Sequence, residues 1–259
     1  MLWRWRGFIL ASAVREIRSR FSRSLLGWVW LLLPPIAMIV IYSVIFSRLM
    51  RAGGLPDLGP FTYTIFLCAG MMSWQWFCDL LTRTTGLFTN YGGLFKRAAV
   101  PWQALLAVDV LVSSFGLVVI FTLFLLFLAA IGQWPGVALL AYFPLLLLQG
   151  LFAVALGMCL AVLQVFFRDV GLALPIVLQF WFWATPIVYP LTILPESIRD
   201  LIQLNFMTAI VSGYQSALMP ALGSPWRAGL LVTVILIPLL MAAALWMLRR
   251  NWDAMRDEF

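Results

Sequence analysis

The sequence predicts an all-α integral membrane protein with six transmembrane helices, an amphipathic helix at the N-terminus and short non-spanning helices between spans five and six. Hydrophobic residues make up 64% of the chain and charged residues only 10%, and the mean hydropathy is +1.01. Such values lie far outside the range of water-soluble domains. Six uncharged runs of about 20 residues take up most of the 259 residues, and a helix of that length crosses the hydrocarbon core. Residues 1–259 are therefore predicted to form a single transmembrane domain.

The N-terminal segment 1–27 has the pattern of an amphipathic helix. Leu10, Val14, Ile17 and Phe21 recur at helical spacing, while arginine and serine residues occupy the opposite arc. This arrangement is typical of a helix that lies in the membrane interface with its arginines toward the lipid headgroups. The apolar run that follows is too long for a signal peptide and lacks a small-residue cleavage site, so we expect the segment to be retained.

The six predicted spans are separated by short polar or proline-containing connections. A Gly- and Pro-containing turn, 132–136, separates the third span from the fourth, and Arg168 and Asp169 form a charged turn before the fifth. Pro34 and Pro35 should bend the first span, and three prolines interrupt the fifth. The predicted spans cover residues 28–47, 58–78, 110–131, 139–167, 171–190 and 228–248.

Two longer segments between spans differ from the rest in composition. Segment 79–109 is rich in polar residues and is predicted to be a cytoplasmic coupling loop, large enough for a short helix and for docking another protein. Segment 191–227 mixes charged and apolar residues. This mixture predicts an outer-face segment that re-enters the membrane or lies in its interface.

The basic residues predict the orientation of the chain. If both termini are cytoplasmic, 13 of the 17 basic residues fall on the cytoplasmic side. Such an excess follows the positive-inside rule. The net charge of +7 therefore reflects membrane topology, and a nucleic-acid partner is not expected, because no aromatic residues are interleaved with the basic ones on a soluble surface.

Several classes of chemistry are excluded by what the sequence lacks. There is no histidine, and the three cysteines each stand alone in apolar sequence, so neither a metal site nor a catalytic centre is expected. No Gly-x-x-x-x-Gly-Lys-Ser/Thr motif is present and Lys96 is the only lysine, so ATP hydrolysis would require a partner protein. Asp79 and Asp109 lie at the ends of predicted spans, which gives little support to an ion-coupled carrier.

Four sequence blocks, taken together, resemble the permeases of polysaccharide-export ABC transporters, a group of type 2 ABC exporters. The blocks are Arg20–Trp30, Ile41–Phe46, Phe167–Gly171 and Thr185–Pro190, and their order and spacing cover nearly the whole chain. The chain differs from the family pattern at Phe206, where proline is usual, and at Gln215, where arginine often follows the tyrosine. The residues that carry the resemblance most directly are Gly27, Arg168, Asp169, Thr185, Pro186, Tyr189 and Pro190.

The resemblance implies a function and a set of partners. It implies the membrane subunit of an ATP-driven exporter that moves lipid-linked polysaccharide, such as O-antigen or capsule, from cytoplasm to periplasm through a homodimeric channel in the bacterial inner membrane. The implied partners are a second copy of the chain, two ATP-binding-cassette subunits, membrane lipid, and periplasmic or outer-membrane export components. ATP and Mg²⁺ would be bound by the partner ATPase, and this chain would hold no cofactor.

Three groups of residues are candidates for function, each with a simpler alternative. The polar positions of the coupling loop expected to dock the ATPase are Asn90, Lys96 and Arg97. The arginines expected to bind lipid phosphate, or alternatively only to set topology, are Arg4, Arg15, Arg18, Arg20 and Arg23. The aromatic residues expected to line a glycan channel, or alternatively only to anchor the helices in the interface, are Tyr42, Trp181, Trp183 and Tyr189.

The sequence leaves other functions open. A permease of the same class that exports a drug or a small lipid has the same composition. An ion-coupled carrier or an enzyme acting on polyprenyl lipids is a weaker alternative, since each would need clustered acid–base groups that the sequence lacks.

Overall fold

The computed structural model describes residues 2–21, 27, 29–41, 44, 55, 60–97, 100–223 and 227–258. Within these ranges every regular element is a helix, which confirms the predicted all-α class. Short 3₁₀ helices are labelled η. In chain order the elements are η1 (Leu2–Trp5), α1 (Arg6–Phe21), α2 (Val29–Ile41), α4 (Thr62–Thr85), α5 (Leu87–Asn90), α6 (Gly92–Arg97), α7 (Trp102–Ala130), η3 (Gly136–Ala141), α8 (Tyr142–Phe166), α9 (Asp169–Trp183), η4 (Leu191–Ile193), α10 (Glu196–Gln203), α11 (Phe206–Leu218), η5 (Pro220–Leu222) and α12 (Arg227–Glu258).

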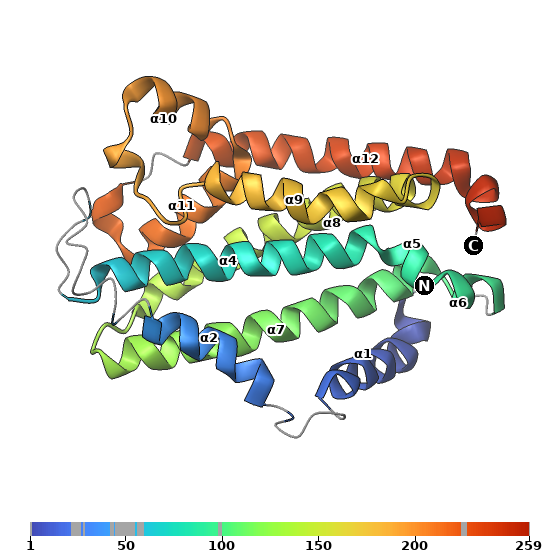
Figure 1. Ribbon diagram of the computed structural model, residues 1–259, viewed down its shortest axis with the longest axis horizontal. Coiled ribbons are helices and arrows are strands. Elements are labelled where there is room, and N and C mark those ends of the chain that lie inside the picture. Colours follow the sequence, from blue (N-terminus) through green and yellow to red (C-terminus); the bar gives the residue numbers. More distant parts are fainter. Residues whose placement is uncertain are drawn as a thin grey trace.

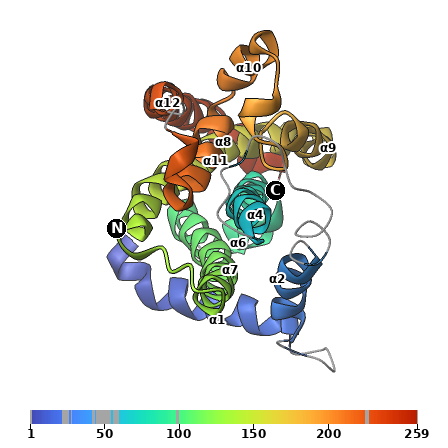
Figure 2. The same ribbon diagram turned by 90° about the vertical axis from the view of Figure 1, so that its left-hand side faces the viewer.

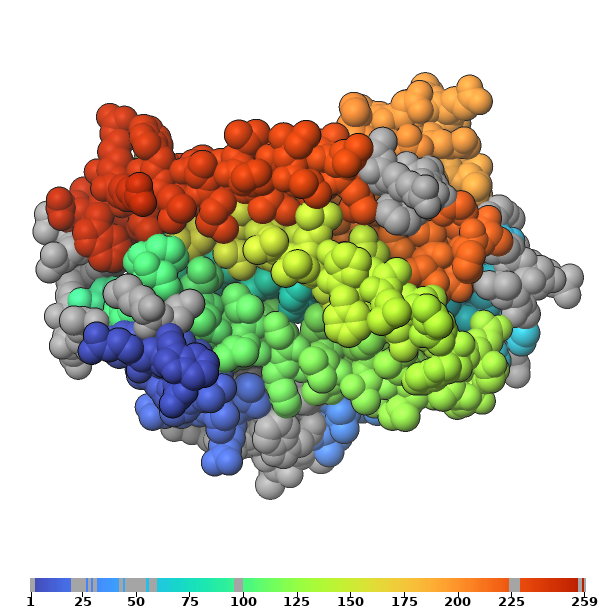
Figure 3. Space-filling model, turned by 180° about the vertical axis from the view of Figure 1, so that it is seen from behind, coloured from blue at the N-terminus to red at the C-terminus, as the bar shows by residue number. Residues whose placement is uncertain are grey.

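The long helices form a bundle that is elongated along their common direction. Helices α4, α7, α8, α9 and α12 run along the long axis, and both termini lie at the end that also carries α1, α5 and α6 (Figure 1). Helices α10 and α11 lie at the opposite end. The end view places α4 in the middle, with α1 crossing below α7 (Figure 2). Helix α8 packs most extensively against α4 and α12, and α12 extends along one edge of the molecule (Figure 3).

Three helical segments of the described chain are long and apolar enough to cross a membrane. They are Trp102–Ala130, Gly136–Phe166 and Gly229–Met255, and they coincide with the third, fourth and sixth predicted spans. Shorter apolar helices occur at Leu32–Ile41 and Asp169–Trp183, within the first predicted span and overlapping the fifth. These segments establish an integral membrane protein, whereas the full count of six spans stays a prediction.

Two of the predicted site residues, Tyr42 and Arg23, lie outside the described residues.

The coupling loop predicted at 79–109 is shorter than the sequence suggests. Helix α4 continues to Thr85, seven residues past Cys78, and α7 already begins at Trp102. A charged residue ends an apolar run but does not end a helix when its charge is paired, and Asp79 and Arg83 are ion-paired one helical turn apart. The segment between the two long helices is therefore 86–101, and it contains α5 and α6.

The ends of the fifth and sixth predicted spans also differ from the helices. Helix α9 ends at Trp183, before the predicted boundary of 190, because Pro186 disfavours helical conformation in the residue that precedes it. Helix α12 continues to Glu258, beyond the last apolar residue predicted to span, since Arg249 and Arg250 are compatible with a helix in water. Segment 191–227 contains the short helices that the sequence predicts.

Small residues bring α4 and α8 close together. Ala153 and Ala161 are fully buried, and a Cβ added to Gly157 would lie 2.7 Å from the Cβ of Thr84. These three positions of α8 recur every four residues, which leaves a flat helix face. Their small side chains allow α4 to approach α8 closely.

A buried polar contact joins the same helices to α11. The Gln149 side chain donates a hydrogen bond to the backbone carbonyl of Ser73 at 2.7 Å and accepts one from the Tyr214 hydroxyl at 2.9 Å. Gln149 is fully buried, so both bonds are expensive to leave unmade. Helix α11 is thereby held between α4 and α8, and most of its residues are buried.

Candidate functional site

One arginine joins the N-terminal helix to the bundle. The Nη1 atom of Arg83 lies 2.7 Å from Oε1 of Glu16 on α1, and its Nε donates to both carboxylate oxygens of Asp79 at 3.1 Å. The same Nη1 lies 3.9 Å from Oδ1 of Asp109 on α7. Three helices that are distant in sequence therefore meet at a single guanidinium. We call Glu16, Asp79, Arg83, Asp109 and Tyr91 the Arg83 junction.

The centre of the Arg83 junction, formed by Arg83 and Asp109, is largely shielded from solvent. The side chains of Arg83 and Asp109 are 13% and 5% exposed. The Tyr91 hydroxyl donates to Oδ1 of Asp109 at 3.1 Å, and burial, followed by the nearby carboxylates, raises the pKa of Tyr91. Oδ2 of Asp109 is buried and has no hydrogen-bond partner among the described residues. The electrostatic balance of this site therefore depends on the one guanidinium that touches all three carboxylates.

Sequence patterns indicate only part of this site. The spacing of Asp79 and Arg83 is the i, i+4 spacing of a helical ion pair, and Glu16 is the only acidic residue of the basic N-terminal segment. Both signals are weak alone. The convergence of Glu16, Asp79 and Asp109 on Arg83 follows from the crossing of α1 over α7 and the packing of α4 beside α7, which no local pattern specifies.

Helix α1 presents arginines to its surroundings and packs against α7. Ile9 and Ala13 are buried, whereas Leu10 and Val14 are 57% and 46% exposed. Leu10 and Val14 of the predicted apolar stripe therefore point away from the bundle, whereas Ile17 is partly buried and packs with Ile9 and Ala13 against it. The described side chains of the predicted phosphate-binding arginines are all exposed, namely Arg4, Arg15 and Arg18; the side chain of Arg20 lies outside the described part.

The segment predicted to dock an ATPase is anchored by aromatic side chains. Phe88 of α5 is fully buried and packs against Phe95 of α6 and Trp252 of α12, with ring centroids 5.7 and 6.3 Å away. Asn90, at the end of α5, is exposed. Lys96 and Arg97 end α6, but their side chains are not among those described. The short helices are thus fixed to the bundle while one face of α5 and α6 stays accessible.

At the opposite end, Asn205 ties α9 to α11. Its Oδ1 accepts hydrogen bonds from Nε1 of Trp181 at 3.0 Å and from the backbone N–H of Met207 at 3.1 Å, which caps α11. Its Nδ2 donates to the Ala184 carbonyl at 3.1 Å and to Oγ1 of Thr185 at 3.0 Å. With a neutral asparagine at this position, all four bonds can form together.

Replacing Asn205 should destabilise this end of the molecule. We expect Asn205→Ala to cost about 1–3 kcal/mol, because it removes a helix cap and leaves the Trp181 N–H and the Ala184 carbonyl unpaired. Asn205→Asp should cost less, since a carboxylate still accepts from Trp181 and Met207 but cannot donate. Thermal unfolding in detergent, followed by tryptophan fluorescence, measures both. Equal stability of the alanine and wild-type proteins would contradict this account.

The segment Thr185–Pro190, which carries part of the family resemblance, is held by distant residues. Nε2 of Gln215 donates to the Pro186 carbonyl at 3.1 Å, and the Tyr63 hydroxyl donates to the Val188 carbonyl at 2.7 Å. Thr185, Pro186 and Pro190 are buried. The segment therefore has a structural role at the junction of α4, α9 and α11.

The other residues of the family motifs lie in turns. Arg168 precedes α9 and Asp169 begins it, both exposed, and an acidic residue in the first turn is favourable there. Gly27 has a positive φ of 47°, a conformation that glycine adopts without strain.

The structure separates the aromatic residues predicted to line a channel. Trp181 packs among Phe77 and Phe206, with centroids 5.4 and 5.0 Å away, so most of its ring belongs to the core. Trp183 is 60% exposed, and the Tyr189 hydroxyl donates to its backbone carbonyl at 2.8 Å. Trp183 and the partly exposed Tyr189 are therefore joined by a hydrogen bond, whereas Trp181 packs against the core.

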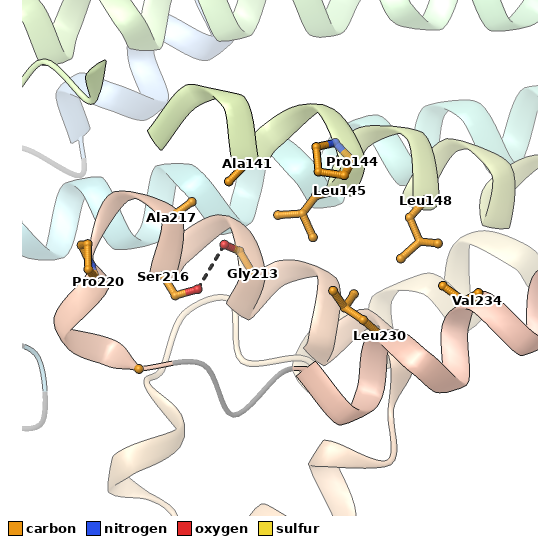
Figure 4. Close-up of a pocket in the computed structure, with 11 residues that line it drawn as sticks. Ala141, Pro144, Leu145, Leu148, Gly213, Ser216, Ala217, Pro220, Leu230 and Val234 are labelled. Carbon is orange, nitrogen blue, oxygen red and sulfur yellow. Dashed lines mark hydrogen bonds between the residues drawn. The ribbon is translucent and has the colours of Figure 1, made fainter. Parts of the chain in front are cut away.

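An apolar cavity of about 560 Å³ lies between η3, α8, α11 and α12 (Figure 4). Leu145 and Leu148 of α8 face Leu230 and Val234 of α12 across it. The Ser216 hydroxyl is turned onto the Gly213 carbonyl at 3.2 Å. The lining suits hydrocarbon and offers little to a polar solute.

The long apolar helices define an integral membrane protein. The protein-family model for the ABC-2 type transporter matches residues 8–219 of the chain. The chain belongs to the ABC-2 type transporter family. Members of this family are membrane subunits that work with an ATPase partner.

The chain is similar to proteins of O-antigen export and of polysialic acid transport. The chain is 30% identical to the O-antigen export system permease protein RfbA of Myxococcus xanthus, over 100% of this chain and 96% of that protein. It is 24% identical to an RfbA of Klebsiella pneumoniae over 79% and 77% of the two chains. It is 26% identical to the polysialic acid transport protein KpsM of Escherichia coli over 80% and 79%.

Proposed function

We propose that this chain is the membrane subunit of an ATP-driven exporter that carries lipid-linked polysaccharide from the cytoplasm to the periplasm. The observation that carries the proposal is the similarity to an O-antigen export permease along the whole length of the chain. The sequence contains no nucleotide-binding loop, which agrees with a subunit driven by a separate ATPase. The function is transport, without a catalytic residue in this chain.

The proposed path of coupling begins at the end that carries both termini. Helices α1, α5 and α6 lie there (Figure 1), and Arg83 connects α1 to α4 and α7. A push on α1 from a docked ATPase would therefore reach two long helices through a single ion-paired side chain. Asn90, Lys96 and Arg97 are the proposed docking positions on the neighbouring segment.

The remaining parts of the proposal concern assembly and placement. Two copies of the chain, with two ATPase subunits, would enclose the channel in the bacterial inner membrane with both termini cytoplasmic, as the distribution of basic residues favours. The exposed arginines of α1 would attract the phosphate of a lipid carrier. Trp183, which is 60% exposed, and the partly exposed Tyr189 are the proposed aromatic positions that would meet a glycan.

A second function, export of a small lipid, is supported by the apolar cavity. Its leucine- and valine-lined walls fit a hydrocarbon chain better than a sugar. The two functions predict that different molecules fail to be exported in cells that lack the protein.

Deletion of the gene distinguishes them. We expect surface polysaccharide to fall at least tenfold and its lipid-linked precursor to accumulate on the cytoplasmic side, because the polymer is too polar to cross the bilayer unaided. Surface glycan is measured by antibody or lectin binding, and precursor by extraction from inverted and right-side-out vesicles. Complementation with the wild-type gene is the control. Normal surface glycan in the deletion strain would overturn the exporter and favour the small-lipid permease.

A further inference from the structure

A second cavity, of about 180 Å³, lies at the end of the molecule that carries α10 and α11. Phe66 of α4, Leu191 of η4 and residues of α10 and α11 form its walls. It adjoins the apolar cavity, since Ser216 lines both. Its volume corresponds to about six water molecules, which is the space that a single sugar ring fills.

Apart from Arg199, the polar side chains that line this cavity are neutral hydrogen-bonding groups. The Gln203 amide and the Ser212 hydroxyl line it and make no hydrogen bond to the described residues. Gln215 also lines it, oriented by its bond to the Pro186 carbonyl. Amides and hydroxyls can both donate and accept, as the hydroxyls of a sugar do. Phe66 and Leu191 offer apolar surface for the C–H face of a ring.

Arg199 gives the cavity a fixed positive charge. Its guanidinium donates to the carbonyls of Leu191 at 3.2 Å and Leu194 at 3.0 Å, so it is held in place by backbone. No acidic side chain is found among the described residues that line the cavity. The charge therefore remains available to an anionic group and is unfavourable for a cationic one.

We infer that this cavity binds one sugar unit of the exported glycan, neutral or acidic but not a cationic amino sugar. The inference rests on the proposed export of polysaccharide. A glycan that leaves the channel at this end would be held there one ring at a time by Gln203, Ser212 and Gln215. Polar groups left unpaired in the cavity would reject a ligand without hydroxyls.

The test uses the purified full-length chain in lipid nanodiscs, with Cys68, Cys78 and Cys159 replaced by alanine. The reporter is Leu191→Cys, which lines the cavity without supplying a polar contact. The matched control is Leu201→Cys on α10, which is 68% exposed and does not line it. The rate of maleimide labelling is measured with methyl glycosides of neutral hexoses, N-acetylhexosamines, hexuronic acids and hexosamines.

At least one neutral or acidic sugar should slow labelling at position 191 at least fivefold and leave position 201 unchanged. Hexosamine should give no protection. Adding Ser212→Leu should remove the protection, because leucine enters the existing cavity, and an unchanged thermal unfolding midpoint shows that the variant is folded. Protection that survives Ser212→Leu would overturn the inference.

The remaining outcomes separate this inference from the proposed function. Protection by phosphocholine but by no sugar would identify a lipid-headgroup site and overturn the sugar assignment. If no sugar slows labelling at position 191, the inference is also overturned. If deletion of the gene still traps precursor in the cytoplasm, export stands and only the cavity assignment fails; normal surface glycan in that strain would remove the basis of both.

Discussion

Arg83→Ala should abolish export and lower the free energy of unfolding by about 2–4 kcal/mol. The substitution removes the one guanidinium that contacts Glu16, Asp79 and Asp109, so three carboxylates would face one another with Asp109 almost fully buried. The cost is below that of a fully buried pair, because Glu16 and Asp79 are 29% and 42% exposed and water screens them. Surface glycan and thermal unfolding in detergent measure the two effects.

A second variant separates lost coupling from uncompensated charge. Arg83→Ala combined with Asp109→Asn should recover part of the stability, because the buried carboxylate is neutralised, but export should stay low since α1 is no longer tied to α4 and α7. The matched control is Arg15→Ala on α1, an exposed residue, which should change stability by less than about 0.5 kcal/mol. Normal export by the Arg83→Ala protein would show that the junction has no part in coupling.

Gly157→Leu should prevent α4 and α8 from packing and cost about 3 kcal/mol or more. A Cβ at this position would lie 2.7 and 2.8 Å from Cβ and Cγ2 of Thr84 and 3.3 Å from the Leu81 carbonyl. Extra methylenes in a well-packed core typically cost about 1–3 kcal/mol. The two helices form one of the largest contacts in the bundle. The unfolding midpoint in detergent and the yield of monodisperse protein measure the effect.

The contact can be tested by exchanging the small residue between helices. Gly157→Ala alone should destabilise, and combining it with Thr84→Gly should recover part of the loss, because the clashing atoms are removed. Gly116→Ala on α7 is the matched control, since a Cβ there meets no atom within 4 Å, and it should be neutral or slightly stabilising. Equal effects of alanine at positions 116 and 157 would mean that α4 and α8 are not closely packed.

The site was only partly predictable because its members are brought together by helix crossings. Asp79 and Asp109 were expected at span ends, where charges reach water, and Asp109 instead lies inside the bundle beside Tyr91. Trp181 was expected to line a channel or to anchor its helix in the interface, and its ring packs against Phe77 and Phe206 while its N–H donates to Asn205. The hydrophobic pattern of a sequence does not reveal whether lipid or protein surrounds an aromatic ring, because both environments are apolar.

The sequence by itself determined the class of protein, the positions of the three spans that the structure supports and the distribution of positive charge. These properties depend on the transfer free energy of each residue between water and lipid, which adds along the chain and needs no knowledge of neighbours. Only the tertiary structure decided which polar groups meet. The Arg83 junction, the Asn205 cap and the cavity at Gln203 and Ser212 each combine residues from different helices. Hydrogen bonds and ion pairs act over a few ångströms, so their partners are chosen by helix packing and not by spacing in the sequence.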